Sequence, residues 1–150
     1  MKKTCLILAL IPVLLLLTVV GLLLGPAGEL AEVATAPVSY RQLHADDRKD
    51  VPPFAQNIYR AVYAHWQVGE WAWCFDIPPG SEEQLKQWVN AKGGSPRDVA
   101  QCCELTGLTP PEWWTRPADA RLVSNRNLEL TRMSMWFSPS LNRVWILYEQ

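Results

Sequence analysis

The stretch GEWAWCFDI, Gly69–Ile77, decides the fold that the sequence predicts. Large apolar side chains alternate along it with small or polar ones. Trp71, Trp73 and Phe75 share one side, and Cys74 lies on the other. Alternation with a period of two is typical of a β-strand that buries one face. We therefore expect the aromatic face to lie in the core and the Cys74 face to point outward.

Further strands are predicted on both sides of this stretch. The segment NIYRAVYAHW, residues 57–66, is rich in β-branched and aromatic residues and is close enough to pair with residues 69–77 as an antiparallel hairpin. Met135 or Trp136, together with Ile146, should face the aromatic side of that hairpin. The C-terminal region adds ARLVSN, LELTRMSMWF and RVWILYE, which are separated by turn residues, and SPSLN joins the last two as a hairpin.

Two helices are expected between these groups of strands. The first, residues 81–92, has Ser81 as N-cap with Gln84 completing a capping box, and it ends at a Gly-Gly pair. The second, residues 95–106, has Pro96 at its first helical position. The predicted fold class is therefore α+β, a small antiparallel sheet with two helices packed on one face.

The N-terminal run Cys5–Gly25 has no charged residue and is long enough for a transmembrane helix, and Lys2 and Lys3 before it place the N-terminus inside. A cleaved signal peptide is the alternative. We expect a single-pass protein of a bacterial inner membrane with its C-terminal domain in the periplasm. The expected parts are a transmembrane signal anchor (1–25), a tether (26–50) and an α+β domain (51–150).

The cysteines offer two interpretations. In an oxidising compartment Cys74 could form a disulfide with Cys102 or Cys103, and otherwise the thiols stay free and buried. No C-x-x-C spacing supports redox chemistry. His44 and His65 are far apart and the adjacent cysteines lack the spacing of zinc ligands, so no metal and no cofactor is expected. A net charge of −1 without a basic stripe also argues against a nucleic-acid partner.

The segments PPFAQNIYRAVYAHW, CFDIP, PPEWW and MWFSPSLNRVWILYE follow one another in this order. In that order the chain, from Pro52 to Tyr148, resembles small uncharacterised bacterial envelope proteins. The resemblance implies an N-terminal membrane signal before a compact domain with a Trp/Pro segment and a final strand pair. It implies no catalytic or binding residue.

The candidate binding residues are Trp113, Trp114 and Arg116, which lie in a proline-rich connection. An exposed Trp on a stiff loop is a typical binding anchor, although both Trp could instead cap the sheet. The favoured hypothesis is a membrane-tethered interaction module, inhibitor-like in size, that binds another envelope protein through this loop or through an exposed sheet edge. The alternative is an envelope enzyme with Cys102 or Cys103 as nucleophile and His65 as base.

Overall fold

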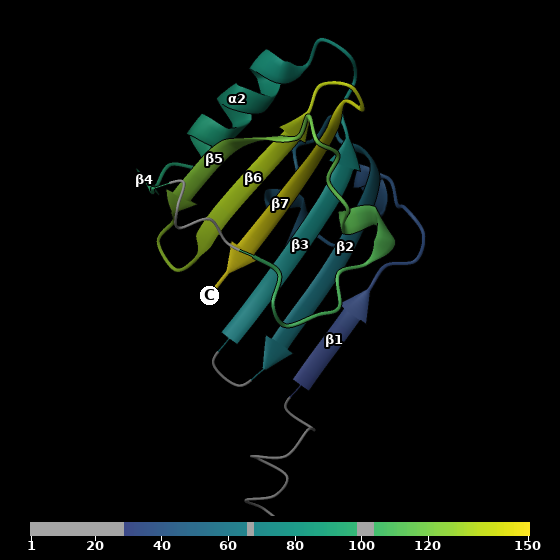
Figure 1. The fold of residues 1–150 in the computed structure, drawn as a ribbon, viewed down its shortest axis with the longest axis vertical. Coiled ribbons are helices and arrows are strands. Elements are labelled where there is room, and N and C mark those ends of the chain that lie inside the picture. The colour runs from purple at the N-terminus through teal and green to yellow at the C-terminus, as the bar shows by residue number, and fades with distance from the viewer. Residues whose placement is uncertain (1–28, 66–67, 99–103) are drawn as a thin grey trace, which may run out of the picture.

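The computed structural model describes residues 29–65, 68–98 and 104–150. These residues form a seven-stranded antiparallel sheet and one α-helix (Figure 1). Across the sheet the strand order is β1-β2-β3-β7-β6-β5-β4. The elements are β1 (Glu29–Val33), β2 (Gln56–His65), β3 (Val68–Asp76), α2 (Glu82–Ala91), β4 (Ser95–Pro96), β5 (Arg121–Asn127), β6 (Arg132–Ser138) and β7 (Arg143–Glu149), with 3₁₀ turns at Tyr40–Gln42, Asp47–Lys49 and Glu112–Trp114.

The predicted strands are confirmed, and the last of them joins the N-terminal strands of the sheet to the C-terminal ones. β2 and β3 form the expected antiparallel hairpin, and β6 and β7 form the second one. β7 then pairs with β3, which places Ile146 directly opposite Trp73. Met135 is in turn opposite Ile146. The most apolar strands therefore lie in the middle of the sheet, where both of their edges are hydrogen-bonded.

One face of the sheet is covered by α2, which buries Leu85 and Val89 against it. Trp73 and Phe75 are fully buried in this helix-face core, so the prediction for the aromatic face is confirmed. The helix ends where Gly93 takes a positive φ of 72°. The predicted capping box is absent, because the Ser81 side chain makes no cap hydrogen bond.

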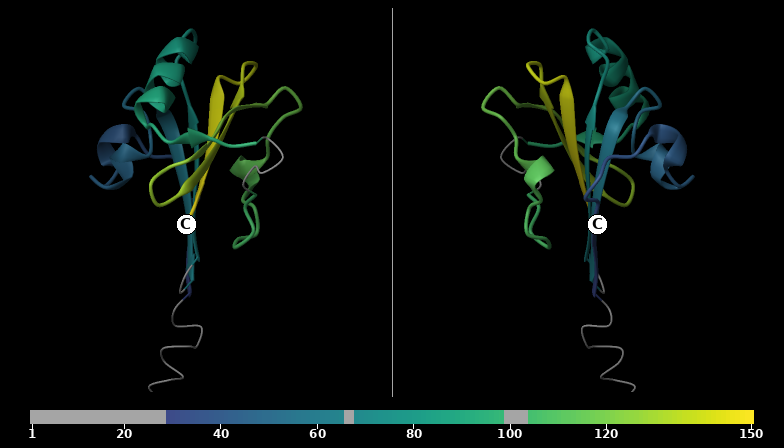
Figure 2. Two further views of the ribbon diagram at one scale, coloured as in Figure 1. Left: turned by 90° about the vertical axis from the view of Figure 1, so that its left-hand side faces the viewer. Right: turned by 90° about the vertical axis from the view of Figure 1, so that its right-hand side faces the viewer.

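The other face is covered by residues 104–120, which we call the strap. Figure 2 shows α2 and the N-terminal 3₁₀ turns on one side of the sheet and the strap on the other. Under it lies a second core of Ala61, Ala72, Cys74, Trp114, Trp136, Trp145 and Leu147. The expectation that Cys74 points outward is wrong, since its side chain has 0% exposure. The sheet is buried on both faces, by a helix on one and by irregular chain on the other.

The predicted second helix, residues 95–106, is corrected. Ser95 and Pro96 form β4, which pairs with the end of β5. The Arg97 N–H then donates to the Asn125 carbonyl oxygen at 2.9 Å. Residues 99–103 lie outside the described residues, and residues 104–106 are not helical. The predicted fold with two helices on one face is therefore wrong. The local sequence at residues 95–97 favours a helix start, but these residues pair with the distant strand β5.

The segment expected to be a tether also contributes to the sheet. β1 pairs with β2 along its whole length, from Glu29 opposite His65 to Val33 opposite Ala61. A further bridge joins Val38 to Ile58. Residues from 29 onward are therefore packed on the folded unit.

The predicted membrane segment, residues 5–25, lies outside the described residues. Within the described ranges no helix is long and apolar enough to cross a membrane, and α2 has only 10 residues. The described structure therefore does not support the predicted transmembrane signal anchor or the single-pass inner-membrane location.

Candidate functional site

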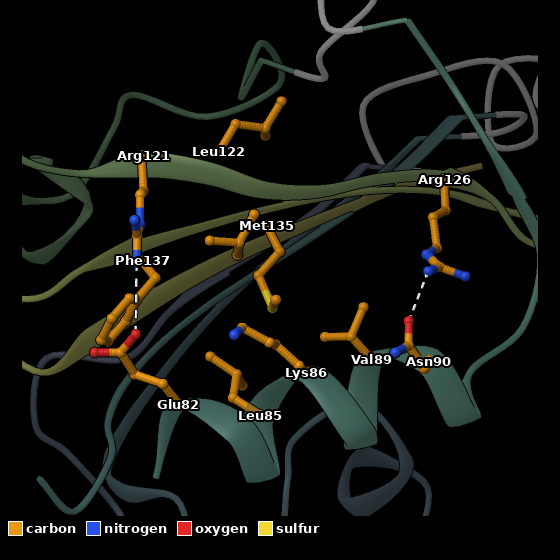
Figure 3. A pocket seen from close by; sticks show the side chains of 11 residues that line it. Glu82, Leu85, Lys86, Val89, Asn90, Arg121, Leu122, Arg126, Met135 and Phe137 are labelled. Atoms are coloured by element: carbon orange, nitrogen blue, oxygen red, sulfur yellow. Dashed lines mark hydrogen bonds and ion pairs between the residues drawn. The ribbon is translucent and has the colours of Figure 1, made fainter. Parts of the chain in front are cut away.

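A groove of about 480 Å³ lies between α2 and β5 (Figure 3). Its floor is apolar and consists of Leu85 and Val89 from the helix with Met135 and Phe137 from β6. The two helix positions are four residues apart and the two strand positions two apart, so each pair points to one side. The side chains are at most 4% exposed, yet they form the base of an open groove.

The rim of the groove is polar and mainly basic. At one end Arg121 forms an ion pair with Glu82 at 3.5 Å, and at the other Arg126 donates to the Asn90 side chain at 2.9 Å (Figure 3). Lys86 lies on α2 between these two contacts. Because the side chains of Arg121 and Glu82 are 61% and 45% exposed, their ion pair adds little stability and either can exchange its partner.

A second groove of about 500 Å³ lies between the 46–50 turn and the β5–β6 turn. Two of the aspartates that line it are engaged in ion pairs. Lys92 lies 3.7 Å from Asp50, and Arg60 lies 3.5 Å from Asp47. Burial raises the pKa of Asp50 and lowers the pKa of Lys92. The first of these ion pairs fastens the end of α2 to the N-terminal turn. Together they engage two of the three aspartates that line the groove, so we favour the α2–β5 groove as the binding site.

The strap brings the three candidate residues of the sequence together. Trp113 is half-buried, and its Nε1 donates to the Ala34 carbonyl oxygen at 3.0 Å. Trp114 is 7% exposed, and Arg116 is exposed with its guanidinium 4.0 Å from the centre of the Trp136 ring. Trp145 donates from Nε1 to the Trp113 carbonyl oxygen at 3.0 Å. The two Trp are held on the second core, and a binding role for this surface stays a prediction.

The strap is anchored by Glu70, a residue that the sequence analysis did not single out. Its side chain is on the Cys74 face of β3, and the residue is only 3% exposed. Its carboxylate accepts hydrogen bonds from the Thr106 N–H and hydroxyl, and from the Gly107 N–H at 2.9 Å. A Cβ on Gly107 would lie 2.0 Å from the Tyr63 ring, so this close approach requires glycine. The signal for Glu70 was a charged residue beside Trp71, near the start of a central strand.

The structure corrects the predicted disulfide of Cys74 and does not test the predicted role of Cys102 or Cys103 as a nucleophile. Cys74 is a free buried thiol, so its predicted disulfide with Cys102 or Cys103 is wrong. Cys102 and Cys103 lie outside the described residues, and so does the side chain of His65, which leaves the alternative enzyme without a described site. In the described part of the chain, no three His, Cys, Asp or Glu side chains could hold a metal ion together.

We expect Cys74 to resist thiol reagents in the folded protein. Burial raises its pKa from 9.0 to about 12, so almost no reactive thiolate is present near neutral pH. Maleimide labelling at mildly alkaline pH, mapped to the Cys74 peptide by mass spectrometry, should show no adduct without denaturant and complete reaction with it. Because the unfolded chain loses this proton at a lower pH than the folded chain does, the thiol should also make the fold less stable as pH rises from 9.0 toward 12. Rapid labelling of the native protein would show that the strap does not cover this face.

No family model, curated protein or solved structure matches the chain. The class that its fold and grooves define is thus a small antiparallel-sheet domain with a helix on one face and a tryptophan-rich strap on the other. Any function has to be argued from the grooves themselves.

Proposed function

We propose that this protein is an interaction module and that the α2–β5 groove is its binding surface. The observation that supports the proposal is the open apolar floor of four side chains beneath a basic rim. The floor is already largely shielded from water, so binding energy comes mainly from exposed apolar lining such as Val123 when a partner excludes water from it. Polar groups at the edge fix the orientation of the partner and exclude poor fits.

Two further features support a partner of protein nature. The groove is elongated along α2 and is bounded on its other side by a strand, a shape that suits a peptide segment better than a compact small molecule (Figure 3). Val123 adds an apolar side chain to the lining, and it is 39% exposed. An exposed valine beside buried apolar residues extends the floor to the surface, where a partner side chain can enter.

Selection of displayed random peptides on the wild-type protein tests this function. We expect the selected peptides to lose at least about ten-fold in affinity when Val123 is replaced by aspartate, because a carboxylate would then be desolvated against the apolar part of the peptide. Isothermal titration calorimetry measures the change. The exposure of Val123 keeps this substitution from disturbing the fold.

Leu141→Asp is the matched control, since Leu141 is 50% exposed in the β6–β7 turn and does not line the groove. It introduces the same charge at another exposed aliphatic residue and should change affinity by less than about two-fold. If Val123→Asp and Leu141→Asp leave binding equally intact, the groove is not the binding surface. If instead a Trp113→Ala variant stays folded but no longer binds the selected peptides, the strap is the binding site.

A further inference from the structure

The outer edge of β5 is only partly paired in the described chain. β4 covers its end, with Ser95 opposite Asn127 and Pro96 opposite Arg126. The last described bond of this pairing runs from the Arg97 N–H to the Asn125 carbonyl oxygen. Within the described ranges, no strand pairs with the outer side of residues 121–124. An open strand edge offers backbone donors and acceptors to another extended chain.

This edge borders a further groove of about 280 Å³, which is lined by Pro96, Arg97 and residues 122–126 of β5. It shares Leu122, Val123 and Arg126 with the α2–β5 groove, so the two hollows lie on either side of the same strand. Ser124 also lines it. Its hydroxyl is buried and makes no hydrogen bond with the described residues. Buried hydroxyls are normally hydrogen-bonded, so the Ser124 hydroxyl is an unsatisfied hydrogen-bonding group beside this strand edge.

The two grooves are lined mainly by basic side chains. Their linings contain four basic residues, Lys86, Arg97, Arg121 and Arg126, against one acidic residue, Glu82. The chain as a whole has a formal net charge of −1, so this surface is basic on a slightly acidic protein. Complementary charge favours an acidic partner, mainly through its rate of association and its selectivity.

We propose that the occupant of the site is an acidic, extended peptide segment of another protein, which adds as a strand to the outer edge of β5. Its backbone pairs with the open edge at residues 121–124, an apolar side chain enters the α2–β5 groove, and its carboxylates face Arg121 and Arg126. Only an extended main chain matches a row of backbone donors and acceptors, which favours a peptide over a small anion. This inference rests on the proposed function and specifies the partner.

Three capped peptides and one small amphiphile test the inference. The first peptide repeats Glu-Thr-Val-Thr, so in an extended strand its glutamates and valines lie on one face, as Arg121, Arg126 and the apolar floor of the groove do. The second has the same sequence with alternate backbone amides N-methylated, and the third has lysine in place of glutamate. The amphiphile is dodecanoate. Calorimetry should show binding of the first peptide, at least about ten-fold weaker binding of the N-methylated one, and none of the lysine peptide. Arg121→Gln should lower the affinity for the first peptide about five-fold and make its binding less sensitive to salt.

Each contrary result has a separate meaning. Equal binding of the N-methylated peptide would overturn strand addition, and equal binding of the lysine peptide would overturn the preference for acidic partners. Binding of dodecanoate without binding of the glutamate peptide would assign the groove to a small amphiphile. A dimer in light scattering that the glutamate peptide cannot dissociate would assign the edge to a second copy of the chain. If selected peptides still bind in a Val123-dependent way while the glutamate peptide does not, the inference fails and the proposed function stands.

Discussion

Replacing Trp73 with alanine should lower the free energy of unfolding by about 3–5 kcal/mol, the range for deleting a large buried aromatic side chain. Trp73 has 0% exposure and lies in the helix-face core opposite Ile146. Arg60 covers its ring, with the guanidinium 5.6 Å from the ring centre. A domain of this size is stable by about 5–15 kcal/mol in total, so the variant should be close to unfolding at physiological temperature. Urea unfolding followed by circular dichroism measures the loss.

Trp73→Phe is the matched control, because it keeps an aromatic ring and removes the indole N–H. That N–H is buried and has no hydrogen-bond partner among the described residues, so its loss offsets part of the smaller ring volume. We expect a loss on the order of 1 kcal/mol for this variant. A loss below about 1 kcal/mol for Trp73→Ala would mean that the helix-face core does not depend on this residue.

The central strands could be predicted because their signal is local. In β3 the alternation of Trp73 and Phe75 with small residues predicts both a strand and the face that this strand buries. What the alternation cannot show is whether the second face is also covered. Cys74 is buried because the strap, more than 30 residues further along the chain, folds back over it. An irregular segment such as the strap has no periodic sequence pattern, so its position over the sheet cannot be predicted from the sequence.

The elements that were predicted wrongly depend on contacts between distant residues. Residues 95–97 have the proline and polar residues of a helix start, but their backbone pairs with residues 125–127. β1 has its two glutamates three residues apart, without the alternation of a strand, and is too short to be recognised as a strand by itself. Its pairing with β2 is a long-range contact as well. Local propensity is weak in both segments, and tertiary pairing decides their structure.

Half of the candidate groove was visible in the sequence. Leu85 and Val89 have helical spacing, so an apolar side of α2 could be predicted. The other half required the structure, because β5 and β6 come to lie opposite α2 only through the order of strands in the sheet. The basic rim illustrates the same point, since Arg121 and Arg126 gain their partners, Glu82 and Asn90, across more than 30 residues of chain.

Replacing Trp114 with alanine should also lower the free energy of unfolding by about 3–5 kcal/mol. Trp114 is 7% exposed, and its ring makes edge-to-face contacts with Trp113 and Trp136 at centroid distances of 6.0 and 6.3 Å. Arg116→Ala is the control from the same strap. Arg116 is exposed and rests on the Trp136 ring, so its removal should cost only about 0.5–1 kcal/mol.

Cys74 reports whether the strap detaches or the whole domain unfolds in the Trp114→Ala variant. If only the strap detaches, maleimide should label Cys74 in native buffer while circular dichroism still shows the sheet, because the helix-face core does not include Trp114. If the two cores unfold together, labelling and loss of the sheet should have the same urea midpoint. A variant that loses less than about 1 kcal/mol and keeps Cys74 protected would contradict a structural role for Trp114. The surface of Trp113, Trp114 and Arg116 would then compete with the α2–β5 groove as the binding site.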